Sequence, residues 1–128
     1  MKNRLIIILL TVVFGCSSPV DQLKGSWDDK KGQLLNFYDQ GRAEWIYYTY
    51  GEKETADTFK LKYEVNFEKK PFHLKLSGFD RGPLKGKSLF GIIEINQKTL
   101  KIDSQGGSSE NVRPKSFDSE NTELYYKK

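Results

Sequence analysis

The stretch Phe59-Lys60-Leu61-Lys62-Tyr63-Glu64-Val65-Asn66-Phe67 carries the clearest structural signal in the chain, because apolar and polar residues alternate along its whole length. Successive side chains of a β-strand point to opposite faces, so this alternation predicts a strand with one buried face and one solvated face. Strands of this kind are typical of antiparallel sheets that have a core on one side and water on the other.

The same alternation recurs towards the carboxyl terminus and predicts further strands. Apolar residues occupy alternate positions in the segments 72–76, 89–95 and 100–102, and Leu124 and Tyr126 close the series. Glycine, proline, asparagine and aspartate separate these segments, as is usual at strand ends. We therefore expect Leu124 and Tyr126 to lie on the buried face of a last strand.

A hairpin is predicted on the amino-terminal side. Asp39-Gln40-Gly41 joins the segments 34–38 and 42–50, and a three-residue connection of this kind places its glycine in a left-handed conformation. Residues Ala43 to Tyr50 of the second segment are largely apolar or aromatic on both faces, so we expect this strand to contact other groups on each side.

Seven to nine short strands that follow one another along the chain predict an antiparallel meander. Closing the meander into a barrel removes the free edge strands that invite aggregation. We expect an all-β fold in which residues 23–128 form a small up-and-down barrel of about eight strands. The glycine-rich segments 78–87 and 105–111 are predicted to be exposed loops.

Residues 1–15 have the pattern of a signal peptide. Lys2 and Arg4 precede an apolar stretch from Leu5 to Phe14 that only Thr11 interrupts. A helix of ten residues spans about 15 Å, roughly half of the hydrocarbon thickness of a bilayer, so a permanent transmembrane anchor is the poorer interpretation.

Val13-Phe14-Gly15-Cys16 resembles the bacterial lipobox, although Phe14 stands where a smaller residue is more usual. The resemblance implies cleavage before Cys16 and acylation of its thiol, with chains such as palmitate, and an ordinary secretory signal is the alternative. Cys16 is the only cysteine of the chain and has no disulfide partner within it. Residues 16–22 are then expected to be the lipidated cysteine and a polar tether.

This interpretation predicts a lipid-anchored protein of the cell envelope. Ser17 stands where enterobacterial-type sorting has the aspartate that retains lipoproteins at the inner membrane. We therefore expect the outer membrane to be the location if the envelope is Gram-negative. More than one acyl chain makes such an anchor stable.

The charge of the chain gives no argument for a nucleic-acid partner. The formal net charge is +4, and it falls to +2 when Lys2 and Arg4 leave with the signal peptide. A basic group of six residues is expected to be a solvated face, with contact to anionic headgroups or an acidic partner as the alternative: Lys69, Lys70, Lys75, Arg81, Lys85 and Lys87.

The inventory of reactive residues predicts a protein that is not an enzyme. His73 is the only histidine, and it alternates with apolar neighbours, which favours a position on the polar face of a strand. One histidine and one cysteine cannot supply the cluster of ligands that zinc requires. The sequence therefore predicts neither a metal site nor a cofactor.

Gly25-Ser26-Trp27 resembles the Gly-x-Trp motif that opens lipocalin barrels. The segments 63–65, 71–76, 91–95, 99–102 and 113–117 follow one another in the order seen in a family of uncharacterised lipocalin-like bacterial domains. The resemblance implies that Trp27 packs at the closed end of the barrel beneath a late arginine, for which Arg113 is the candidate. The chain is shorter than full lipocalins and lacks their disulfides, so the resemblance does not imply a large calyx.

Two hypotheses for the function follow, and both leave the oligomeric state open. In the first, the barrel is a binding module whose interior holds a small apolar ligand, with candidate residues Trp45, Tyr47, Tyr63 and Leu74. In the second, the barrel is filled and the protein acts as an envelope interaction protein or inhibitor, contacting another protein through Tyr48 and Tyr50 or through the segment 79–87.

Overall fold

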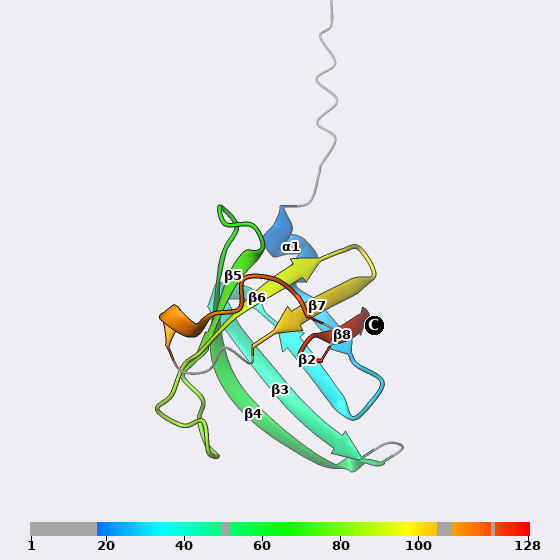
Figure 1. Cartoon of the computed structure of the whole chain (residues 1–128). Helices are drawn as coiled ribbons and strands as arrows, with labels where there is room; N and C mark the ends of the chain where they lie inside the picture. The colour runs from blue at the N-terminus through cyan, green and yellow to red at the C-terminus, as the bar shows by residue number, and fades with distance from the viewer. Residues whose placement is uncertain (1–17, 50–51, 105–108, 119) are drawn as a thin grey trace, which may run out of the picture.

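The computed structural model describes residues 18–49, 52–104, 109–118 and 120–128. A short helix and eight strands follow one another: α1 (Pro19–Leu23), β1 (Gly25–Asp28), β2 (Gln33–Phe37), β3 (Arg42–Thr49), β4 (Glu52–Asn66), β5 (Phe72–Ser77), β6 (Leu89–Ile95), β7 (Thr99–Asp103) and β8 (Glu123–Lys127). Each strand pairs antiparallel with the next, and β8 pairs with β1 to close the barrel (Figure 1). The predicted up-and-down barrel of about eight strands is confirmed.

The alternating stretch of the sequence forms the second half of β4. Leu61 and Tyr63 are buried in the barrel, whereas Lys60, Lys62 and Glu64 are exposed on its outer wall. The predicted hairpin is also confirmed: β2 and β3 pair from Phe37 and Ala43 onward, and Asp39–Gly41 forms a single 3-10 turn, η1, between them. Gly41 has the left-handed φ of 69° that the sequence predicts.

Every strand contributes buried side chains to the hydrophobic core inside the barrel. The most deeply buried members of this core include Trp27, Leu74, Leu100 and Tyr125 (0% exposed). Tyr63 packs edge-on against Phe37 with ring centroids 4.9 Å apart, and its hydroxyl donates to the carbonyl of Tyr38. The middle of the barrel is therefore a packed core.

The barrel has two different ends, because the connections of an up-and-down barrel alternate between them. We call the end covered by α1 the closed end. It also carries η1, the β4–β5 turn, the β6–β7 turn and the last residues of β8 (Figure 1). The opposite end, the mouth, carries the β1–β2 turn, the β3–β4 hairpin and the β5–β6 loop.

Helix α1 corrects the prediction that residues 16–22 are a tether. Ser18 accepts a hydrogen bond from the backbone N–H of Asp21, and Pro19 occupies the first turn, where its missing N–H costs nothing. Leu23 is fully buried beneath the barrel end. Residues 18–22 are therefore part of the folded domain and not a tether, while Cys16 and the predicted signal peptide lie outside the described residues.

The predicted face of the last strand is wrong. Register with β7 places Tyr125 opposite Leu100 and points its side chain into the core, where it is 0% exposed. Leu124 and Tyr126 point outward and are 38% and 37% exposed. Three consecutive apolar residues leave the inward face undetermined by alternation alone, and pairing with β7 decides it.

The predicted loop 78–87 is largely exposed, apart from Phe79 and the half-buried Leu84, and residues 109–111 of the second predicted loop are exposed. In the β5–β6 loop, Phe79 is buried in the core, because the loop folds over the mouth. In the β7–β8 connection, residues 109–118 cross the outside of β5 and β6, and Figure 1 shows this segment in orange. Residues 105–108 lie outside the described part of the chain. No helix in the described residues is long and apolar enough to cross a membrane.

Candidate ligand site at the barrel mouth

A cavity of about 270 Å³ opens at the mouth between the ends of β3 and β4 and the β5–β6 loop. It is lined by Trp45, Tyr47, Asp57, Phe59, Phe79, Arg81, Pro83 and Leu84. Because Trp45 pairs directly with Phe59 across the two strands, their rings stand on the same inner face. Most of the wall is aromatic or aliphatic.

Three aromatic rings form one continuous surface in this pocket. The rings of Trp45 and Tyr47 are stacked at 5.5 Å, and Tyr47 meets Phe59 edge-on at 5.9 Å. Tyr47 is 41% exposed, so the surface is accessible from solvent. Burial of the rest of the residue, with Glu123 and Asp29 nearby, raises the pKa of Tyr47 and keeps its phenol neutral at physiological pH.

The opposite wall is held over the cavity by Arg81. Its guanidinium lies 5.0 Å from the ring centroid of Phe59, pairs with Asp57 and donates to the carbonyl of Thr58. These contacts join the β5–β6 loop to β4 across the mouth. Arg81 and Asp57 are also the charged groups at the rim of the cavity.

A polar network closes the barrel beneath the cavity. The indole N–H of Trp45 donates to Oε1 of Gln33 at 2.9 Å, and the hydroxyl of Tyr125 donates to Glu123 at 2.6 Å. The same Tyr125 hydroxyl lies 3.2 Å from Oε1 of Gln33. Burial, followed by the contact with Glu123, raises the pKa of Tyr125. These groups satisfy one another, so the base of the pocket is a paired polar layer.

The structure brings together only half of the predicted ligand-binding residues. Trp45 and Tyr47 line the cavity, whereas Tyr63 and Leu74 are 6% and 0% exposed and fill the core. Phe59 was identifiable as an inward residue of the alternating stretch, but alternation does not indicate which end of a strand reaches a cavity. Phe79 and Leu84 also line the cavity, but they lie in a segment that was predicted to be an exposed loop, so the sequence did not indicate them as ligand-binding residues.

Trp27 lies at the closed end, where Lys127 and not Arg113 provides the cation. Its indole N–H donates to the carbonyl of Leu23 at 2.7 Å, and Nζ of Lys127 lies 4.7 Å from the centroid of the ring. Lys127 is the last inward position of β8 and directly faces Trp27. Arg113 belongs to the segment that crosses the outer wall, where its guanidinium lies 5.4 Å from the ring of Phe90. The role predicted for Arg113 is therefore wrong.

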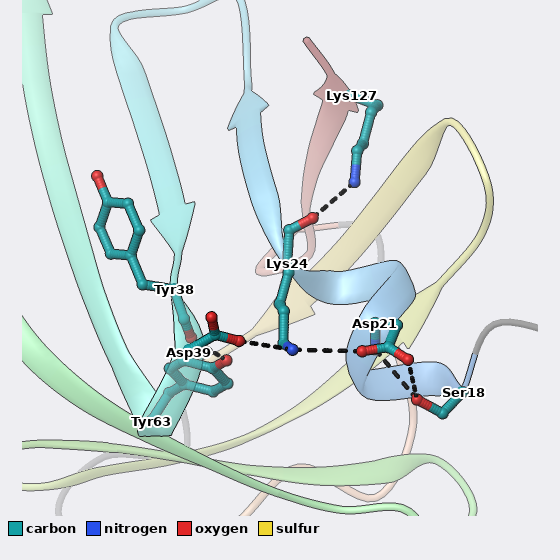
Figure 2. Close-up of polar contacts among 7 residues, drawn as sticks. All are labelled: Ser18, Asp21, Lys24, Tyr38, Asp39, Tyr63 and Lys127. Atoms are coloured by element: carbon teal, nitrogen blue, oxygen red, sulfur yellow. Dashed lines mark hydrogen bonds and ion pairs between the residues drawn. The ribbon is translucent and has the colours of Figure 1, made fainter.

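Polar contacts lock α1 onto this end of the barrel (Figure 2). Nζ of Lys24 lies 3.3 Å from Asp21 and 2.6 Å from Asp39, so it joins the helix to η1. Lys127 reaches back to donate to the carbonyl of Lys24 at 2.8 Å. Hydrogen bonds from Ser18 and Lys24 lower the pKa of Asp21, and the contacts with Asp39 and Asp21 raise the pKa of Lys24. Gly25, the first residue of the predicted motif, begins β1 directly after this cluster.

A second, wider groove of about 970 Å³ lies on the outer wall beneath the segment 109–118. Its charged side chains carry both signs: Lys69, Lys75 and Arg113 against Glu64, Glu68 and Glu110. Burial, followed by the positive charges of Arg113 and Lys69, lowers the pKa of His73, which keeps the imidazole neutral near pH 7. The described residues contain no group of three or more His, Cys, Asp or Glu side chains placed to hold a metal ion.

Comparison with known proteins found no matching family model, no matching curated protein and no matching solved structure. Membership of a lipocalin-like family therefore stays a prediction from the sequence. The closed eight-stranded barrel and its mouth cavity are properties of the structure itself.

Proposed function

We propose that this protein is a lipid-anchored, non-enzymatic envelope protein that binds a small apolar group in the mouth cavity. The observation that carries the proposal is the continuous aromatic surface of Trp45, Tyr47 and Phe59 around an accessible cavity of about 270 Å³. Ligand pockets typically have volumes of about 300–1,000 Å³ and mostly apolar walls. A cavity of about 270 Å³, just below this range, fits one ring or a short aliphatic segment, with the remainder of the ligand outside.

The charged rim adds a preference for the part of the ligand that stays outside. Arg81 and Asp57 flank the cavity and pair with each other. A ligand with a hydrogen-bond acceptor next to its apolar part can accept from the guanidinium without leaving the aromatic wall. We therefore expect a ligand with an apolar end and a carboxylate or carbonyl, such as a fatty acid.

Tryptophan fluorescence provides a direct test, because the two tryptophans lie at opposite ends of the barrel. Titration with dodecanoate should change the emission of Trp45 and leave that of the buried Trp27 unchanged. Tyr47→Ala should weaken binding by about three- to tenfold, since each aromatic contact is worth about 0.5–1.5 kcal/mol. Tyr126→Ala, which removes an exposed tyrosine from the outer wall, is the matched control.

Two results would contradict ligand binding at the mouth. One is the absence of a saturable change with dodecanoate, lysophospholipid and N-phenyl-1-naphthylamine. The other is an equal loss of affinity in Tyr47→Ala and in the control variant.

Anchoring through Cys16 is the second part of the proposal. Support comes from the lipobox-like residues before Cys16 and from the absence of any other cysteine in the chain. The full-length protein should fractionate with membranes, and Cys16→Ala should appear in the soluble fraction. A Cys16→Ala protein that stays with the membrane fraction, or an unmodified Cys16 peptide in mass spectrometry of the membrane-bound protein, would refute acylation.

A filled barrel that contacts another protein is the second candidate function. The core that contains Tyr63, Leu74 and Tyr125 favours this candidate, because these side chains fill the middle of the barrel and leave the cavity at the mouth to hold a ligand. Tyr48, which was predicted to contact a partner, hydrogen-bonds through its hydroxyl to Asp28, and Tyr50 lies outside the described residues. Native mass spectrometry separates the candidates: an additional mass lost on delipidation favours the ligand, and a bare mass after incubation with fatty acids favours a protein partner.

A further inference from the structure

The closed end of the barrel gathers lysines from segments that are far apart in the sequence. Lys69 and Lys70 lie in the β4–β5 turn, and Lys98 lies in the β6–β7 turn. Lys127 ends β8 and Lys128 follows it, and all five lysines are exposed. The backbone N–H of Lys127 donates to the carbonyl of Lys98 at 2.9 Å, which places these two segments next to each other. Figure 1 shows the β4–β5 turn at the same end as α1.

The lysines of the two turns, Lys69, Lys70 and Lys98, form no ion pairs among the described residues. Asp21 and Asp39 are the acidic side chains of α1 and η1, and both contact Lys24. Lys69 and Glu68 of the β4–β5 turn also line the outer groove, so Lys69 borders both surfaces, whereas Lys70, Lys98 and Lys128 do not line the groove.

Apolar groups accompany the lysines on this end. Val20 on α1 is 37% exposed, and Phe67, next to Lys69, packs edge-on against Phe72 at 5.0 Å with part of its surface free. Lysines around a small apolar surface are typical of segments that lie at a lipid interface, where the charges attract anionic headgroups.

The position of Cys16 selects the membrane as the partner, and this step rests on the proposed acylation. Cys16 is three residues before Pro19, the first residue of α1. Three residues span at most about 11 Å, so an acyl chain on Cys16 holds the closed end close to the headgroups. The mouth lies at the other end of the barrel, beyond the packed core.

We propose that the closed end is a docking surface for anionic phospholipid headgroups, so that the barrel stands on the bilayer with its mouth turned away from it. The ligand then enters from the aqueous side of the anchor membrane and not directly from its lipid. The structure also divides the basic group seen in the sequence: Lys69 and Lys70 belong to the docking surface, whereas Arg81, Lys85 and Lys87 belong to the loop at the mouth.

Vesicle sedimentation of the chain from residue 16 onward, with Cys16→Ser to exclude acylation, tests the surface by itself. We expect binding to phosphatidylcholine vesicles that contain phosphatidylglycerol, loss of binding at high salt, and no binding to phosphatidylcholine alone. Each lysine near an anionic surface contributes about fivefold to affinity, so the triple variant Lys69→Gln, Lys70→Gln, Lys98→Gln should bind about 100-fold more weakly.

A matched triple variant, Lys31→Gln, Lys85→Gln, Lys87→Gln, removes the same charge from exposed positions in the β1–β2 turn and the β5–β6 loop, at the mouth. It should change binding by no more than about threefold, since these lysines lie at the opposite end of the barrel from the docked lipid and salt screens attraction over such a separation. Equal losses in the two triple variants would overturn the proposal, as would a failure to bind the anionic vesicles at low salt.

Orientation is read from an environment-sensitive NBD label in the Cys16→Ser background. NBD on Val20→Cys should brighten when anionic vesicles are added, and NBD on Lys85→Cys should not. A response at Lys85→Cys alone would overturn the orientation. These assays contain neither the acyl chain nor the apolar ligand. A negative result would therefore contradict only the docking surface, and it would leave the proposals of acylation at Cys16 and of ligand binding at the mouth unaffected.

Discussion

Replacing Trp27 by alanine should destabilise the barrel by about 3–5 kcal/mol, which is the usual range for a fully buried tryptophan. The indole is 0% exposed, and burial of roughly 200 Å² of aromatic surface at about 25 cal/mol per Å² sets an upper value near 5 kcal/mol. The substitution also leaves the carbonyl of Leu23 without its donor and removes the ring beneath Lys127. Collapse of α1 into the space that is left recovers part of this loss.

Urea unfolding followed by far-UV circular dichroism measures the effect without relying on the deleted fluorophore. Trp27→Phe keeps most of the ring and loses the N–H, so it should cost about 1–3 kcal/mol. Trp45→Ala at the mouth is the control and should cost less than Trp27→Ala, because Trp45 is only partly buried. A loss below about 1 kcal/mol for Trp27→Ala, with an unchanged slope against urea, would refute the assignment of Trp27 as the main support of the closed end.

Three further predictions concern other parts of the barrel. Gly91→Ala should lower the free energy of unfolding by about 3 kcal/mol, because a Cβ at this position would lie 2.2 Å from the carbonyl oxygen of Asp103. The measurement is the thermal midpoint, which should fall. An unchanged midpoint would contradict the close approach of β6 and β7 at Gly91. The hydrogen bond to Asp28 raises the pKa of Tyr48 to about 12, so the stability that this hydroxyl contributes is complete below its unfolded pKa of about 10 and is lost as the pH rises through 12. Tyr48→Phe should therefore reduce the fall of the urea midpoint at alkaline pH. An identical pH profile of the urea midpoint in the variant would contradict this role of Tyr48. Lys127→Met should cost more stability than Arg113→Ala, since only Lys127 contacts the closed end, and the opposite order in urea unfolding would restore the role that the sequence predicted for Arg113.

Much of the fold could be predicted because one physical pattern, alternation with a period of two, dominates the sequence. It located the strand that contains residues 59–66 and the inward side of β6 at Ile93, whereas the glycine of the connection 39–41 located the hairpin. It failed at β8, where Tyr125 lies between two apolar neighbours and only pairing with β7 selects the buried face. Helix α1 is five residues long, too short to show a helical period.

The site was harder to predict than the fold, because a cavity depends on what covers the strands. Trp45 and Tyr47 were identified from their aromatic character, but nothing local distinguishes them from Tyr63, which lies in the core. Arg113 and Lys127 are both cations late in the chain. Only the path of the segment 109–118 over the outer wall shows that Lys127 is the one above Trp27.

The seam between β1 and β8 has a consequence for the order of folding. It consists of two residue pairs, Trp27 with Lys127 and Asp28 with Tyr126, and the backbone N–H of Lys128 adds a hydrogen bond to the carbonyl of Ser26. These partners are about 100 residues apart in the sequence. Bringing them together lowers the conformational entropy of the chain before the seam contributes any stability, so we expect the seam to form late in folding. While the chain is being made, β1 keeps one unpaired edge until Tyr126, Lys127 and Lys128 have emerged. A truncation before Tyr126 therefore leaves an open sheet, and its two unpaired edges can pair with other chains and cause aggregation.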